Sequence, residues 1–202
     1  MKIYVEKIII KNRAPFDNLS LDFKENEIAA LTAVNGNGKT TLLSYIADAW
    51  YEMAKSFFQN EFEGKQNKYY RFSSNAFNID KNQPSFVYIR FKTKTYEDQC
   101  KYYIDYVDIR EKCTQDQYNK AIQLEEKISF DKIQNYISQD YCVKHVSLNF
   151  NKDKAEKIFK DNVITYFPSY RYESPGYLND PYEVNLEFKK KESIFRIFEK
   201  SN

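Results

Sequence analysis

The feature that most constrains this sequence is a short glycine-containing loop at residues 33–41, which reads AVNGNGKTT. Its spacing matches G-x-x-x-x-G-K-[ST] except at the first position, where Ala33 stands in place of glycine. A loop of this kind at the start of a helix points successive backbone N–H groups at phosphate oxygens, and the helix dipole favours the same negative charge. The sequence therefore predicts a phosphate-binding loop.

Each residue type in this loop has a distinct task. Gly36 and Gly38 allow the backbone to come close to the phosphates. Lys39 is expected to reach the β- and γ-phosphates, and the Thr40 hydroxyl is expected to complete the coordination of a phosphate-bound Mg²⁺.

The sequence on either side of the loop fits this hypothesis. Residues 28–34 form a short, nearly uncharged run, which predicts a strand buried on both faces. Residues 39–58 predict a long helix, because apolar residues recur there at helical spacing. The predicted stripe consists of Leu42, Leu43, Ile46, Ala47, Trp50, Ala54 and Phe57.

Composition narrows the class of protein. With 202 residues and 42% hydrophobic content the chain can bury a core, and a net charge of +2 gives no global field that would favour nucleic acid or an anionic membrane. Three widely spaced cysteines suggest neither a disulfide framework nor a zinc site. No signal peptide or membrane helix is evident, so we expect a soluble, cytoplasmic protein. His145, the single histidine, is assigned no role and is expected to lie half-buried in a strand.

Two further strands are expected before the loop, at residues 4–11 and 19–23, where apolar residues alternate. Small nucleotide kinases and GTP-binding proteins usually begin with the loop strand, whereas residues 1–27 precede it here. The segments IIIKNR at 8–13, FDNLSLDF at 16–23 and NGNGKTTLL at 35–43 resemble the opening of ABC-type ATPase heads of the SMC, RecF, RecN and OLD kind.

That resemblance covers the first 58 residues and implies an ATP-binding head with ATP and Mg²⁺ as cofactors. It also implies that Arg13 lies near the nucleotide; the alternative is a solvated surface arginine. No catalytic residue is predicted. The predicted cofactor-binding residues are Arg13, Asn35, Gly36, Asn37, Gly38, Lys39, Thr40 and Thr41, with Thr40 also as the metal ligand.

Beyond the first helix, residues 64–85 are polar and predict a loop insertion, and residues 86–95 and 100–109 predict an antiparallel hairpin. Alternation places Val87, Ile89 and Phe91 on its inner face. The outer row is basic and aromatic, and it is either a plain solvated surface or, with the residues upstream, a nucleic-acid surface. That row consists of Tyr88, Arg90, Lys92 and Lys94, with Lys65, Lys68, Tyr69, Tyr70 and Arg71 upstream.

Three helices and one strand are expected in the remaining chain. The helices span residues 114–128, with Thr114 and Gln117 spaced as a capping box, 129–138 and 152–161. A core strand at 163–167 leads into a segment rich in proline and tyrosine at 168–182. Residues 166–171, YFPSYR, resemble a segment of bacterial ABC-type ATPases in phage-defence systems, so Arg171 is a candidate for a nucleotide or intersubunit contact; the alternative is a loop arginine stacked on tyrosines.

These patterns predict an α/β fold with a P-loop NTPase core, similar to the N-terminal lobe of an ABC-type ATPase, with a flanking antiparallel β-sheet and inserted helices. We expect a single lobe over residues 1–202. Its parts are the strands, loop and first helix (1–58), the insertion and hairpin (59–110), a helical region (111–162), and a core strand with the proline and tyrosine segment (163–202).

Three motifs of an ABC-type head are absent from the sequence: the signature segment, an apolar strand ending in Asp-Glu, and a switch histidine. We therefore expect the N-terminal portion of a longer ATPase, completed by a C-terminal remainder and acting as a homodimer or higher oligomer. The expected partners are an effector protein or DNA, and no membrane. Two alternatives stay open: a self-contained P-loop phosphotransferase, and an interaction module with a vestigial nucleotide site.

Overall fold

We describe a computed structural model of the chain over residues 2–58, 78–94, 101–139, 142–149, 151–165 and 195–196. Strands dominate the first half, and short helices lie between the later strands. In chain order the elements are β1 (Lys2–Arg13), β2 (Phe16–Asp22), α1 (Lys39–Phe57), β3 (Ser85–Lys94), β4 (Lys101–Arg110), α3 (Gln115–Ala121), α4 (Phe130–Gln139), β5 (Cys142–Leu148), α5 (Lys152–Asp161), β6 (Ile164–Thr165) and β7 (Phe195–Arg196).

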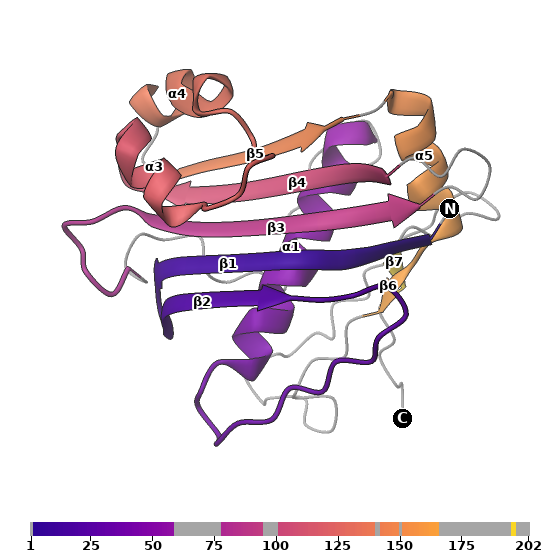
Figure 1. The fold of residues 1–202 in the computed structure, drawn as a ribbon, viewed down its shortest axis with the longest axis horizontal. Helices are drawn as coiled ribbons and strands as arrows, with labels where there is room; N and C mark the ends of the chain where they lie inside the picture. The colour runs from indigo at the N-terminus through magenta and orange to yellow at the C-terminus, as the bar shows by residue number, and fades with distance from the viewer. Residues whose placement is uncertain are drawn as a thin grey trace, which may run out of the picture.

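The centre of the fold is a five-stranded antiparallel sheet in the order β2-β1-β3-β4-β5. Helix α1 crosses one face of this sheet, and α3 and α4 cover part of the other face (Figure 1). The two predicted N-terminal strands and the predicted hairpin are therefore confirmed. The α/β class and the antiparallel sheet agree with the expectation from sequence, but within the described residues this sheet is the centre of the fold and does not flank another one.

Helix α1 begins and ends where its sequence pattern predicts. Trp50 is fully buried, and its ring centroid lies 5.7 Å from that of Phe91 on β3 and 4.6 Å from that of Phe159 on α5. Leu43 departs from the predicted stripe, since it is 42% exposed. The helix is thus docked by an aromatic cluster on the face that it shares with α5.

The predicted faces of the hairpin need one correction. Val87 and Ile89 face α1 as expected, but the other row is not a solvated surface, because Tyr88 is fully buried and Arg90 nearly so. Helices α3 and α4 build a second core over this face. Arg90 tolerates the burial because its guanidinium donates two hydrogen bonds to Asp105, at 2.7 and 2.8 Å.

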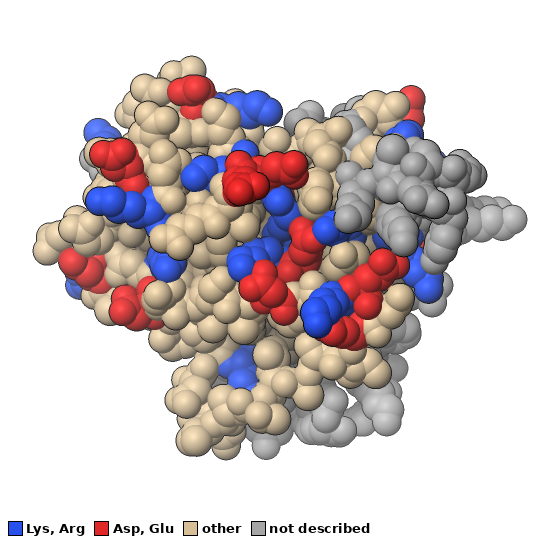
Figure 2. Space-filling view, in the orientation of Figure 1, with Lys and Arg blue, Asp and Glu red and all other residues tan. Residues whose placement is uncertain are grey.

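The buried position of Arg90 weakens the hypothesis of a nucleic-acid surface on this row. Lys92 also has an acidic partner, Glu6. Figure 2 shows Lys and Arg side chains interspersed with Asp and Glu across the visible face, without a concentrated basic patch among the described residues. Residues 64–77, which include the upstream lysines and tyrosines, lie outside the described residues.

The predicted strand at residues 28–34 is a second correction. This segment is irregular in the structure, and Ile28 and Val34 are 99% and 76% exposed. The composition of a strand buried on both faces is realised only when neighbouring strands pair with it. Within the described ranges no strand pairs with residues 28–34.

The later helices follow the sequence pattern with one difference. Helix α3 has the predicted capping box of Thr114 and Gln117 but ends at Ala121, and residues 122–129 are not helical. Ile122 and Ile128 are both buried in the second core, so this connection folds back over the sheet instead of continuing outward. Helices α4 and α5 lie where predicted.

The C-terminal part is described only in outline. Of the predicted strand at 163–167, β6 covers Ile164–Thr165 and pairs in parallel with β7. Arg171 and the proline and tyrosine segment lie outside the described residues. Among the residues that are described, no helix is both long and apolar enough to cross a membrane.

His145 lies in β5 and is half-buried, with its ring centroid 5.9 Å from that of Tyr136 on α4. Burial lowers its pKa, and the nearby charge of Lys132 lowers it further. This is the packed strand histidine that the sequence predicts.

Candidate nucleotide-binding site

The predicted phosphate loop lies at the N-terminus of α1 and has the backbone that its glycines allow. Gly36 and Gly38 have φ angles of 90° and 84°, in the left-handed region that favours glycine. The Asn37 amide donates a hydrogen bond to the Val34 carbonyl at 3.3 Å, which closes a tight turn. The loop therefore reverses direction just before the helix begins.

Gly38 is also required by a close neighbour. A Cβ atom at this position would lie 2.7 Å from Cζ of Phe16, and closer still to Cγ of Pro15. Pro15 lies in the turn between β1 and β2, and Phe16 is the first residue of β2. At Gly36 the space is open, with no atom within 4 Å of a Cβ. The β1–β2 turn thus supports the loop on one side, while the other side faces open space.

The N-terminus of α1 is suited to an anion. No side chain caps this end of the helix, and its first turn carries no acidic residue. The first N–H groups of a helix lack partners within the helix, and the helix dipole is positive there. Thr40 is exposed and Thr41 half-buried, so a ligand can approach this turn.

Lys39 is folded back over the loop. Its ammonium donates hydrogen bonds to the backbone carbonyls of Ala33, at 2.6 Å, and of Val34, at 3.2 Å. These carbonyls lie at the base of the loop, so the positive charge sits beside the turn that Gly36 and Gly38 form. The motif residues from Asn35 to Thr41 are therefore brought together around one helix terminus.

The AAA domain is the family whose model matches this sequence, over residues 7–202. The match extends over nearly the whole chain and includes the loop, α1 and the sheet. The chain belongs to the AAA domain family. A comparison with curated proteins finds no match.

AAA domains are P-loop ATPases, and the family generally uses ATP and Mg²⁺. The uncapped helix terminus and the Lys39 ammonium of this AAA domain fit the phosphates of ATP, and the exposed Thr40 fits one ligand position of a phosphate-bound Mg²⁺. Lys39 and the loop amides would hold the phosphates, and the Thr40 hydroxyl would coordinate the metal. When bound, Mg²⁺ neutralises part of the negative charge of the phosphates.

Arg13 occupies a different environment from the loop residues. Its side chain is fully buried at the end of β1, where Nε donates to Oγ of Ser85 at 2.8 Å and Nη1 lies 3.4 Å from a carboxylate oxygen of Asp108. Ser85 in turn donates to the Asn78 side chain at 2.6 Å. Arg13 is therefore not the solvated arginine of the alternative and does not lie at the loop surface. Its contact with the nucleotide stays a prediction.

Asp108 on β4 is the centre of this buried group. Arg110 also binds it, with distances of 2.7 and 2.9 Å. Burial acts to raise the pKa of Asp108, but the guanidinium groups of Arg13 and Arg110 outweigh it and hold that pKa below its ordinary value. Asp108 is therefore a buried carboxylate that stays ionised.

A second buried carboxylate, Asp48, lies on α1 itself. It accepts hydrogen bonds from Lys144 of β5 at 3.0 and 3.2 Å, and from the Tyr106 hydroxyl at 2.8 Å. Lys144 also reaches Glu52, one turn further along α1, at 3.4 Å. Burial raises the pKa of Asp48 to about 6, although Lys144 and Tyr106 act to lower it.

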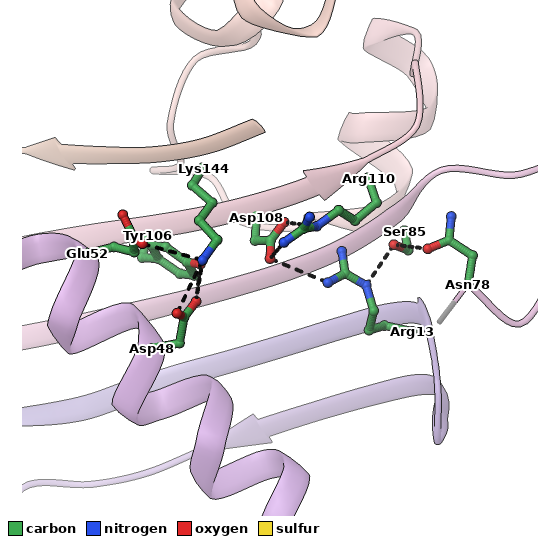
Figure 3. A network of polar contacts seen from close by, with 9 residues as sticks. All are labelled: Arg13, Asp48, Glu52, Asn78, Ser85, Tyr106, Asp108, Arg110 and Lys144. Atoms are coloured by element: carbon green, nitrogen blue, oxygen red, sulfur yellow. Dashed lines mark hydrogen bonds and ion pairs between the residues drawn. The ribbon is translucent and has the colours of Figure 1, made fainter. Parts of the chain in front are cut away.

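Figure 3 shows these contacts as two neighbouring groups, one around Asp48 and one around Asp108. Sequence reasoning missed them, because helical periodicity marked α1 as an apolar stripe. The available signal was Asp48, a charged residue three positions after Tyr45 on the buried face. We define the inner polar layer as Arg13, Asp48, Glu52, Ser85, Tyr106, Asp108, Arg110 and Lys144.

Proposed function

We propose that this AAA domain binds ATP with Mg²⁺ at residues 35–41 and is the N-terminal part of an SMC- or OLD-like ABC-type ATPase. The observation that carries the proposal is the loop itself: two left-handed glycines, an uncapped helix terminus and the Lys39 ammonium lie at one place. Each of these features favours the binding of a polyphosphate.

The wider role that we propose is ATP-dependent dimerisation of two such heads, acting in a DNA-related process or in defence against phage. The support is the resemblance of the first 58 residues to SMC-like heads and of residues 166–171 to defence ATPases. The sequence lacks the signature segment and the Asp-Glu strand. We propose that a C-terminal remainder of the head supplies these groups, and that turnover depends on them.

ATP binding can be tested by thermal unfolding of the chain with and without ATP and Mg²⁺. A ligand that binds only the native state raises stability by RT ln(1 + [L]/Kd), which is about 2.7 kcal/mol at a hundredfold excess over Kd. We expect a higher midpoint with ATP and Mg²⁺, a smaller rise with ATP and EDTA, and no rise in Lys39→Ala.

The control is Lys55→Ala, since Lys55 lies in the last turn of the same helix, away from the loop. This variant should keep the full response to ATP. An equal response in Lys39→Ala and in the wild type would refute binding at the loop. Phosphorylation of a small acceptor by the chain alone would favour the phosphotransferase instead.

A further inference from the structure

The inner polar layer connects the helix of the phosphate loop to the sheet at a buried position. Asp48 is 1% exposed, and its contacts come from Lys144 on β5 and Tyr106 on β4. Figure 3 shows both side chains pointing from the sheet toward α1. One side chain of the helix is therefore held by two different strands.

These contacts are a costly way to dock a helix. Desolvation of buried charges offsets much of their attraction, and apolar replacements are often as stable. Leu42, Trp50 and Met53 already bury α1 against the sheet without charges. Directional hydrogen bonds define the rotation of a helix about its axis and its position along that axis. Apolar contacts fix both less strictly.

The residues of this layer at the end of β1 lie close in sequence to the segment that contacts the phosphate loop. Arg13 is anchored by Ser85 and Asp108 at the end of β1. The turn that follows Arg13 presents Pro15 and Phe16 to Gly38. The charge of Lys144 also lowers the pKa of Asp108, so the two halves of the layer act on each other. The helix is thus held by the group around Asp48, and the segment that contacts the loop follows directly after the group around Asp108.

We infer that Asp48 is a positioning residue: through Lys144 and Tyr106 it fixes α1 on the sheet and so holds the phosphate loop in the conformation that accepts ATP. The inference rests on the proposed function, because it concerns the same loop. It adds a residue that lies inside the domain, away from the loop motif.

The test is Asp48→Asn, which keeps the shape of the side chain and one acceptor oxygen but removes the charge and replaces the second acceptor with an N–H donor. We expect the affinity for ATP with Mg²⁺ to fall about three- to thirtyfold, the range typical of mutations that couple to a site without contacting its ligand. Without nucleotide, the thermal midpoint should fall, because the Lys144 ammonium loses one of its two carboxylate partners. A merely structural role predicts the same lower midpoint with an unchanged affinity for ATP, so the affinity decides between the two.

Glu52→Gln is the matched control. Glu52 lies on the same helix and binds the same Lys144, but its side chain is 20% exposed and lies further from the loop. This variant should bind ATP like the wild type. Lys144→Met removes the contact from the side of β5 and should weaken ATP binding as Asp48→Asn does, which keeps the test decisive if the aspartate variant fails to fold.

Measuring ATP affinity as a function of pH separates the charge of Asp48 from its packing, because packing alone would give no pH dependence. The ratio of the affinities of wild type and Asp48→Asn should approach one below about pH 6, where the wild-type carboxylate is itself protonated. Titration of ATP is common to both proteins and cancels. The groups that face Asp48 are Lys144 on β5, Tyr106 and Asp108 on β4, and Tyr51 and Glu52 on α1. Repeating the pH series in Glu52→Gln separates the titration of Asp48 from that of Glu52.

The outcomes separate the two proposals. If the wild type binds ATP and Lys39→Ala does not, while Asp48→Asn and Lys144→Met both keep wild-type affinity, the inference is overturned and ATP binding stands. A wild type that does not bind ATP overturns both. Reduced affinity in both variants with an unchanged Glu52→Gln supports the inference.

Discussion

At the scale of single residues, the two loop glycines have similar φ angles but different surroundings. Gly36 and Gly38 both have left-handed φ, yet only Gly38 lies against neighbouring side chains, those of Pro15 and Phe16. The motif spacing predicted both glycines. It could not predict the contact with the β1–β2 turn, which depends on how two segments pack in space.

This difference predicts unequal effects of alanine at the two positions. Gly36→Ala should cost about 1–2 kcal/mol, the strain of an L-residue in the left-handed region. Gly38→Ala carries the same strain and also displaces Pro15 and Phe16, so it should cost about 1–3 kcal/mol more. Urea unfolding of the two variants measures the difference, and equal losses would contradict the packing of the loop on the turn.

At the scale of elements, local periodicity predicted α1, the hairpin and the later helices, because each carries its pattern in consecutive residues. Periodicity failed for segments whose burial depends on other parts of the chain packing against them. The row of Tyr88 and Arg90 has the alternation of a solvated face, but α3 and α4 cover it. Residues 28–34 have the composition of a buried strand but lie exposed. Neither result is encoded within the segment concerned.

Asp108 shows how one side chain links elements, since it binds Arg13 of β1 and Arg110 of β4. We expect Asp108→Asn to lower the free energy of unfolding by about 3–5 kcal/mol, because two buried guanidinium groups lose their carboxylate. Unfolding in urea, compared between the variant and the wild type at neutral pH, measures this loss.

The pH dependence of unfolding checks the same contact. The folded pKa of Asp108 lies below its ordinary value of 3.8, so its stabilisation is fully present above that value and is lost as the pH falls through the folded pKa. The wild type should therefore lose more stability than Asp108→Asn as the pH falls below about 4. Parallel losses in the two proteins would show that the pair does not contribute.

At the scale of the whole molecule, the sheet separates two cores, one under α1 and α5 and one under α3 and α4. Sequence reasoning predicted the α/β class and the antiparallel sheet. The strand order β2-β1-β3-β4-β5 was not predictable, because β1 pairs with β3 across residues 14–84, and such long-range pairing leaves no local signal.

This architecture predicts an ordering of amide hydrogen exchange. Strand β3 lies between β1 and β4 and is covered on both faces, so the amides of Val87, Tyr88 and Ile89 should exchange only on global unfolding. Amides of residues 28–34, which are exposed and outside the sheet, should exchange fastest. Mass spectrometry of exchanged peptides measures both, and comparable rates in the two segments would contradict the described fold.

The burial of Trp50 gives this AAA domain an optical reporter of its own. It is the single tryptophan of the chain, it lies on the helix that carries the phosphate loop, and rings from a strand and from another helix enclose it. All tryptophan fluorescence of the chain therefore comes from a fully buried side chain at the contact between α1, β3 and α5. A movement of α1 relative to the sheet that exposes Trp50 to solvent should shift the wavelength of its emission maximum. This can be measured without attaching a label.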